Sequence, residues 1–129
     1  MGVKIIFGLI LFCSLQINAQ TLRLRAKFQE IEINGVKTQT ESDRLLVLNL
    51  DDLYLKIYGN PIESFDIYES FEIDENTFMF PSLDKDGKEF AIELFYSEEY
   101  IFITIQDPTE NSNSTFDHRQ FVCKQIKSE

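Results

Sequence analysis

The sequence predicts an all-β fold, an antiparallel meander of about seven to eight strands that forms a small barrel or a two-layer sandwich. Apolar residues recur mainly at every second position, in short runs rich in Ile, Leu, Phe and Tyr. Turn-forming residues such as Asn, Asp, Gly and Pro separate these runs. The connections are short, so consecutive strands are expected to pair, and closure of the sheet would hide its edges.

The first strand is expected from residue 21, where apolar and basic residues alternate through "TLRLRAKF". One face of this strand carries four apolar residues, Leu22, Leu24, Ala26 and Phe28. The apolar phase then slips to Ile31 and Ile33, which a β-bulge would explain. Asn34-Gly35 is a preferred pair for a tight hairpin turn, so the chain is expected to reverse there.

A second hairpin is expected across Asp51-Asp52, between "RLLVLNL" and "LYLKIY". The second of these runs places Leu53, Leu55 and Ile57 on one face, and "GNP" at residues 59–61 ends the hairpin. The next run, "SFDIYESFEI", is expected to be one strand. Its apolar face carries Phe65, Ile67, Phe71 and Ile73.

Three further strands are expected in "TFMF", "EFAIELFY" and "YIFITIQ". The last of them is apolar on both faces, so it is expected to lie centrally or under another layer. The polar residues 107–115 predict one long loop. The tail "FDHRQFVCKQI" fits either a last strand or a short helix, and elsewhere only the segment around residues 28–33 has room for a helical turn.

The stretch "SLDKDGKEFAIE", residues 82–93, fits two different structures. An EF-hand calcium loop would use Asp84, Asp86 and Glu93 as ligands. However, Ser82 stands where the first carboxylate ligand is needed, and the flanking runs predict strands where an EF-hand has helices. The calcium loop is therefore the weaker hypothesis.

The alternative is a structural turn in which Asp84 precedes a three-residue loop of Lys85, Asp86 and Gly87. Glycine suits the left-handed position at the end of such a loop. Counting outward from this loop sets Phe80 opposite Ile92 and Phe78 opposite Leu94, on one apolar face with Phe90. A two-residue loop would split these residues between two faces, so burial favours the three-residue loop.

The domain organisation predicted is a signal peptide over residues 1–19 and a single all-β domain over residues 20–129. The N-terminal segment has one basic residue, Lys4, then an apolar run too short to span a bilayer, then the small residue Ala19 at the expected cleavage point. The protein is therefore expected to be exported, to the periplasm or the exterior of a bacterium, without membrane insertion after cleavage. Cys123 is then the one remaining thiol, so the domain must fold without an internal disulfide.

The net charge of −10 argues against nucleic acid and anionic lipid surfaces as partners. The expected partner is an unknown protein or a small ligand, and the sequence leaves the oligomeric state open. Low-specificity candidates for ligand binding are Glu69, which falls in the apolar phase of its strand, and a set of tyrosines, Tyr54, Tyr58 and Tyr68. A strand end or a bulge would instead leave Glu69 in solvent, and this is the favoured interpretation.

Catalytic and cofactor motifs are weak or missing in the sequence. His118 and Cys123 are five residues apart, so in a strand they would point to opposite faces. The acid pairs at residues 51–52 and 98–99 look like turn residues, and Asn113-Ser114-Thr115 matches the short N-glycosylation pattern. We therefore expect no cofactor and no metal, and a non-enzymatic binding or interaction protein. The alternatives are a carrier with an internal cavity and a small carboxylate-based hydrolase.

Overall fold

The computed structural model describes residues 21–108 and 118–126, and these residues form strands and loops without a helix. The C-terminal run, for which the sequence allowed either a strand or a short helix, forms a strand over His118–Gln125. The strands are β2 (Thr21–Ile33), β3 (Val36–Glu41), β4 (Leu45–Asn49), β5 (Tyr54–Ile57), β6 (Glu63–Ile67), β7 (Phe71–Asp74), β8 (Thr77–Leu83), β9 (Glu89–Tyr96), β10 (Ile101–Gln106) and β11 (His118–Gln125).

Eight of these strands close into an antiparallel barrel, in the order β2, β4, β5, β6, β8, β9, β10, β11. The ring closes because β11 pairs with β2. The predicted all-β meander is confirmed, and of the two predicted architectures the barrel is the one observed. The remaining strands lie outside the ring, since β3 pairs with β2 and β7 pairs with β8. Closure removes the sheet edges of the ring, and β3 and β7 carry the edges that are left.

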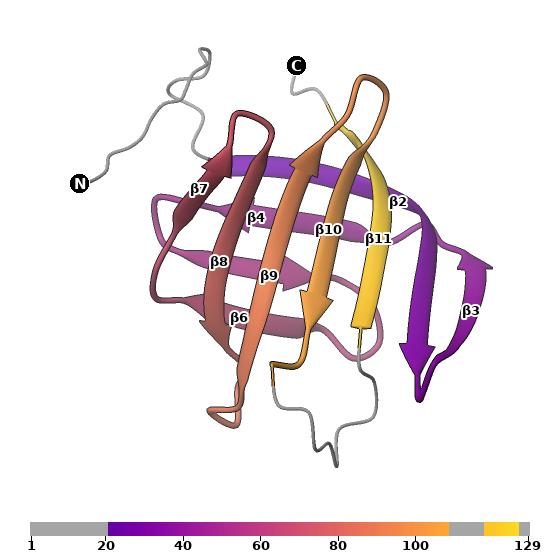
Figure 1. The fold of residues 1–129 in the computed structure, drawn as a ribbon, viewed down its shortest axis with the longest axis horizontal. Coiled ribbons are helices and arrows are strands. Elements are labelled where there is room, and N and C mark those ends of the chain that lie inside the picture. Colours follow the sequence, from indigo (N-terminus) through magenta and orange to yellow (C-terminus); the bar gives the residue numbers. More distant parts are fainter. Residues whose placement is uncertain (1–20, 109–117, 127–129) are drawn as a thin grey trace.

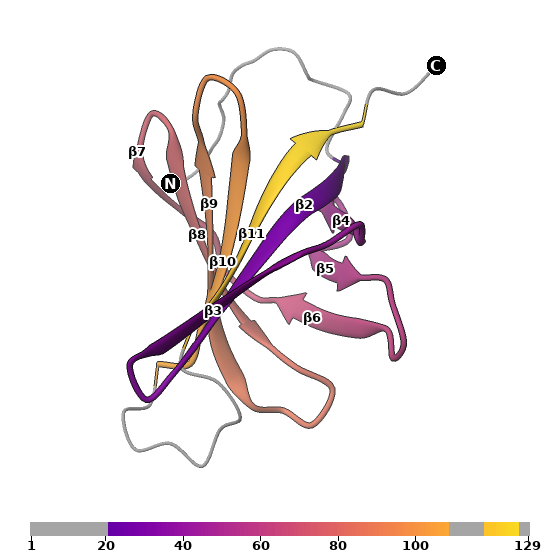
Figure 2. The same ribbon diagram turned by 90° about the vertical axis from the view of Figure 1, so that its right-hand side faces the viewer.

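The barrel has two layers, with β4, β5 and β6 running behind and across β8 to β11 (Figure 1). The view from the side shows β4, β5 and β6 on one side of the molecule and β7, β8 and β9 on the other (Figure 2). Strand β2 belongs to both layers, because it pairs with β4 over Thr21–Arg25 and with β11 over Leu24–Glu32. It changes direction at a bulge where Ala26 pairs with Cys123 and Phe28 with Val122, which leaves Lys27 as the extra residue.

The interior of the barrel is filled by apolar side chains that alternate with outward-facing residues along each strand. On the front layer the buried set includes Phe80, Phe90, Ile92, Leu94, Ile101, Ile103, Ile105, Phe121 and Cys123. On the back layer and β2 it includes Leu24, Ala26, Leu46, Leu48, Leu55, Ile57, Phe65 and Ile67. Phe65 of β6 and Phe90 of β9 meet across the interior with ring centroids 5.5 Å apart. This core replaces the disulfides that the chain does not form internally.

Four predicted positions on the apolar faces are wrong. Phe71 is 46% exposed and Ile73 is 58% exposed, because the run "SFDIYESFEI" is two strands with a break at residues 68–70, and β7 lies outside the ring. Leu53 is 43% exposed, because it occupies a turn position with a φ of 60° and not the start of β5. Phe28 also faces outward, because the bulge precedes it and does not follow it.

The turn between β8 and β9 has the register that the three-residue loop predicts. Phe80 pairs with Ile92 and Phe78 pairs with Leu94. The Asp84 carboxylate accepts hydrogen bonds from the backbone N–H groups of Asp86 and Lys88, each at 2.9 Å. Gly87 has a φ of 84°, and its N–H donates to the Asp84 carbonyl at 3.0 Å.

Charged residues connect the two layers at one end of the interior. The Arg119 guanidinium of β11 donates to both carboxylate oxygens of Glu63 on β6, at 2.7 and 3.3 Å. Arg44 lies 3.6 Å from the same carboxylate. Arg119 is only 6% exposed, so this bidentate pair offsets the cost of burying its charge.

The junction between β6 and β8, which we call the seam of the barrel, has a short hydrogen-bonded ladder. Strands β6 and β8 pair through Asp66 with Leu83 and Ile67 with Ser82. The Tyr68 N–H adds a bond to the Pro81 carbonyl at 3.1 Å, after which the chain leaves the ring. The neighbouring β8–β9 ladder extends over the whole of β8, from Thr77 to Leu83. Side-chain contacts across the interior therefore supply much of what holds β6 to the front layer.

Candidate functional site

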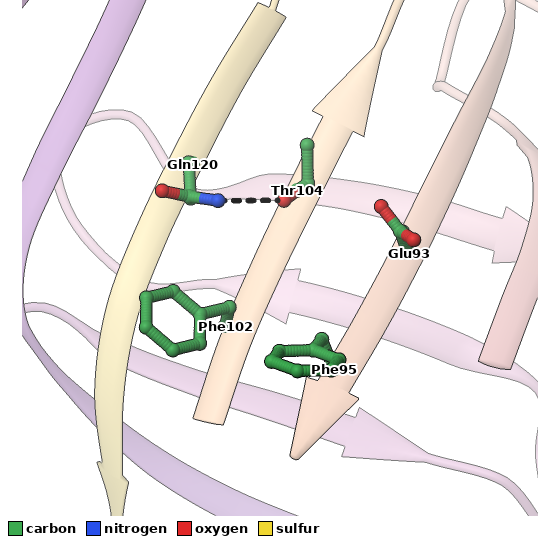
Figure 3. A pocket seen from close by; sticks show the side chains of 5 residues that line it. All are labelled: Glu93, Phe95, Phe102, Thr104 and Gln120. Atoms are coloured by element: carbon green, nitrogen blue, oxygen red, sulfur yellow. Dashed lines mark hydrogen bonds between the residues drawn. The ribbon is translucent and has the colours of Figure 1, made fainter. Parts of the chain in front are cut away.

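The candidate site is a pocket on the outer face of β9, β10 and β11 (Figure 3). Its lining residues are Glu93, Phe95, Phe102, Thr104 and Gln120. They come from neighbouring strands in register, since Glu93 pairs with Thr104 and Thr104 with Gln120. Phe95 pairs with Phe102 in the next row on the same face. The alternation that buries Phe90, Ile92 and Leu94 turns all five pocket residues outward.

The aromatic half of the pocket is built from side chains that the barrel core does not use. Phe95 is 40% exposed, and its ring centroid lies 6.0 Å from that of Phe102. Tyr100 continues the group at 6.5 Å from Phe102. The outer face of a barrel strand is ordinarily polar, so an aromatic group here is an apolar surface without a role in the core.

The polar half of the pocket is formed by Glu93, Thr104 and Gln120. The Gln120 side-chain amide donates to the Thr104 hydroxyl at 3.3 Å, which holds both side chains against the sheet (Figure 3). Thr104 is only 5% exposed, so the sheet surface is recessed at that point. Glu93 lies on the other side of Thr104 and supplies the one acidic group of the lining.

The pocket has a volume of about 310 Å³ and is open to solvent. Phenyl rings attract cations through their negative faces, and a carboxylate adds a charge-assisted acceptor. A group that is both apolar and cationic, such as a Lys or Arg side chain, therefore fits the lining better than an anion does. Acid–base catalysis by two carboxylates would need a second acid, which the lining does not contain.

A second pocket, of about 240 Å³, lies at the connection between β9 and β10. It is lined by Tyr96, Ser97, Glu98, Glu99, Tyr100, Ile101 and Gln125. The Ser97 hydroxyl donates to the Tyr100 carbonyl at 3.0 Å and accepts from the Tyr100 N–H at 3.1 Å. Glu98 and Glu99 thus occupy a tight turn, which is the position predicted for this acid pair.

The tyrosines predicted from the sequence do not gather into one site with Glu69. Tyr54 begins β5 and Tyr58 follows its last residue, and the Lys56 Nζ lies 5.3 Å from the centroid of the Tyr54 ring. Tyr68 is 51% exposed, and its hydroxyl donates to the Glu89 carboxylate of β9. That hydrogen bond, followed by desolvation and the charges of Glu89 and Glu69, raises the pKa of Tyr68. Ligand binding by these residues stays a prediction.

Glu69 is exposed in the connection between β6 and β7, since the strand ends before it. This position agrees with the favoured interpretation from the sequence, in which the strand ends and leaves Glu69 in solvent. His118 and Cys123 occupy opposite faces of β11, with Cys123 fully buried in the interior. Burial raises the pKa of the Cys123 thiol to about 12, so the thiolate needed for nucleophilic attack is disfavoured.

The proposed calcium ligands do not converge either. Asp84 is occupied by the turn hydrogen bonds, while Glu93 lies within β9 on the outer face. Within residues 21–108 and 118–126, no group of three or more His, Cys, Asp or Glu side chains could hold a metal ion. The predicted signal peptide at residues 1–19 and the glycosylation pattern at Asn113 lie outside the described residues.

Two patterns in the sequence indicate the aromatic half of the pocket, although the predicted site residues did not include it. Phe95 breaks the apolar alternation of "EFAIELFY", and "YIFITIQ" is apolar on both faces. Together these patterns place aromatic residues on the outer face of two paired strands. The contribution of Gln120 from β11 had no local signal, because it depends on the β10–β11 register across a long connection.

No protein-family model matches the chain, and no curated protein matches it significantly. In the part of the chain that the structure describes, no helix has both the length and the apolar character needed to cross a membrane.

Proposed function

We propose that this protein is an exported, non-enzymatic binding module of the bacterial envelope or exterior, and that its outer pocket binds a Lys or Arg side chain of a protein partner. The observation that carries the proposal is the position of Glu93 beside the exposed ring of Phe95 and the half-buried ring of Phe102, on a face that the core does not need. A carboxylate and two phenyl faces within one pocket are suited to a cation with an aliphatic stem.

The charge of the protein supports the choice of a cationic group. The chain has 22 acidic residues against 12 Lys and Arg, so its surface attracts basic partners over distances of about 8 Å at physiological salt. Its own cations already lie over aromatic rings. Lys124 is 5.3 Å from the Tyr100 ring centroid and Lys88 is 5.6 Å from that of Phe90. The same contact is open to a partner's cation at Phe95.

A surface role agrees better with the packed interior than does an internal carrier. The buried side chains from both layers fill the barrel, and the pocket of Glu93, Phe95 and Phe102 lies outside this core. The export part of the proposal rests on the sequence of residues 1–19 alone.

The test is a titration of the ¹⁵N-labelled protein with N-acetyl-lysine amide and N-acetyl-arginine amide, followed by amide chemical shifts. We expect saturable shifts centred on Glu93, Phe102 and Gln120, with a Kd on the order of 1 mM for a single side chain. Glu93→Gln should weaken binding about threefold to tenfold, because it removes the charge and keeps the shape. Phe95→Ala should weaken it by a similar factor.

The matched control is Glu72→Gln, which makes the same chemical change on the exposed strand β7. It should leave the affinity unchanged, and N-acetyl-glutamate amide should produce no shifts in the pocket. Equal affinities for the Glu93→Gln and parent proteins, or shifts located away from β9 to β11, would remove the basis of the proposal.

A further inference from the structure

Strand β3 presents an open edge along its full length. It pairs with β2 on one side, and all six of its residues are exposed. It ends the strand order of the sheet and extends away from the ring, beyond β11 (Figure 1). An edge of this kind offers a row of backbone N–H and C=O groups to another strand.

The backbone phase of β3 tells which residues face that edge. The Ser42 N–H donates to the Lys27 carbonyl at 2.9 Å, so the groups of Ser42 point toward β2. Because N–H and C=O groups alternate in direction along a strand, Val36, Thr38 and Thr40 also point toward β2. The outward N–H and C=O groups therefore belong to Lys37, Gln39 and Glu41.

These three residues are complementary to a second copy of themselves. When two β3 strands pair antiparallel about a two-fold axis at Gln39, the outward groups of Gln39 meet those of its counterpart. Lys37 of each copy then lies opposite Glu41 of the other, which makes two opposite-charge pairs. Centring the pair on Thr38 or Thr40 also aligns outward groups, but each of those registers leaves one charge opposite Gln39.

We propose that the protein forms a two-fold symmetric dimer through β3, with Gln39 at the axis and Lys37 paired with Glu41 across the interface. We choose a second copy of β3 as the strand that pairs with this edge, because one register, centred on Gln39, aligns both the outward backbone groups and the opposite charges of the two strands. Glu41 lies opposite Phe28 within its own hairpin, so β2 offers it no cation at that position. The pocket residues are not involved, and the inference goes beyond the function proposed above.

The dimer is expected to be weak. Two six-residue strands form an interface below the roughly 1,200 Å² of stable complexes, and each copy carries a net charge of −10. Sedimentation velocity on the purified protein should therefore show a monomer–dimer equilibrium with a Kd on the order of 100 μM at about 0.15 M salt, where long-range repulsion is screened.

Charge-swap variants test the register directly. Lys37→Glu and Glu41→Lys each place like charges at both pairs, so each should weaken dimerisation at least tenfold. The double variant Lys37→Glu, Glu41→Lys restores opposite charges and should return the Kd to within about threefold of the parent value. Lys85→Glu makes the same charge change in the β8–β9 turn and should leave the Kd unchanged.

Gln39→Pro provides an independent test, because proline removes an N–H that points away from β2. We expect a folded monomer with the circular dichroism spectrum of the parent. A parent protein that stays monomeric up to 1 mM, in the range for weak binding, would overturn the proposal. So would a dimer that survives both single charge swaps, or a double swap that fails to restore association.

Discussion

The two faces of the β8 to β11 sheet both carry phenylalanine, but the two sets differ in what surrounds them. Phe80, Phe90 and Phe121 face inward and are at most 6% exposed. Phe95 and Phe102 face outward, where Phe95 is 40% exposed and the two rings lie beside the polar side chains of the pocket. The inner set is explained by burial in the core. The outer set is not buried in the core, which is why we propose that it binds a partner.

The largest expected contrast between the faces is in thiol reactivity. In a protein carrying Cys13→Ser, Cys123 should react with a disulfide reagent at pH 8 about a thousandfold more slowly than an unfolded thiol, because burial raises its pKa from 9.0 to about 12. Lys124→Cys in a Cys123→Ala background moves the thiol to an exposed position and should react at close to the unfolded rate. Comparable rates for the two proteins would contradict the assignment of faces along β11.

The same pKa shift gives a dependence of stability on pH. The unfolded thiol ionises near pH 9 while the folded thiol stays protonated to about pH 12. Between these values the unfolded state has lost a proton that the native state keeps, so this group lowers the free energy of unfolding as pH rises. Cys123→Ala should remove that part of the alkaline destabilisation.

The second contrast is in the cost of removing a ring from each face. Phe121→Ala should lower the free energy of unfolding by about 3–5 kcal/mol, because Phe121 is fully buried and its loss leaves a cavity. Phe95→Ala should cost about 1 kcal/mol or less, because much of its ring is already in water. Urea unfolding measures both values, and similar costs would mean that the outer aromatic group is structural.

The smallest expected effect concerns the turn that fixes which residues face inward. Gly87→Ala should lower the free energy of unfolding by about 1–2 kcal/mol, because a φ of 84° is unfavourable for residues with a Cβ atom. No atom lies within 4 Å of the added Cβ, so the cost is conformational and not steric. Lys85→Ala in the same loop should cost close to nothing.

Nuclear Overhauser contacts between Phe80 and Ile92 should persist in the Gly87→Ala protein, since the apolar face holds the register. A shift of these contacts by one residue would exchange the inner and outer faces. That result would show that the turn, and not burial, sets the register.

The sequence predicted the parts of the fold that depend on local alternation. The turn between β8 and β9 and the pairing of these strands followed from Asp84, Gly87 and the apolar alternation of the two flanking runs, although β8 continues to Leu83, beyond the predicted run "TFMF". The break between β6 and β7 was not predicted, because Phe71 and Ile73 continue the alternation of Phe65 and Ile67 although they lie outside the ring. Period-two patterning shows which residues share a face of an extended chain, and it does not show where a strand leaves the barrel.

Features that depend on contacts between strands far apart in the chain also could not be predicted from the sequence. Arg119 and Glu63 are 56 residues apart and meet because β11 and β6 face each other across the interior. The pocket needs Gln120 beside Thr104, and that register is set by barrel closure. The tyrosines were chosen from residue type, which carries no information about whether side chains converge. Glu69 was chosen from the apolar phase of its run, which ends with β6 at Ile67, before Glu69.

The short ladder between β6 and β8 makes this seam the place where the barrel is expected to open first. Few backbone bonds must break there, whereas opening at β8–β9 would break a ladder along all of β8. The Arg119–Glu63 ion pair and the Phe65–Phe90 contact both attach β6 to the front layer. Both contacts must therefore break before β6 can separate from β8. Transient separation of β6 from β8 would expose the interior side chains of both layers to water without unfolding either layer. Local opening of the barrel is therefore expected between these two strands.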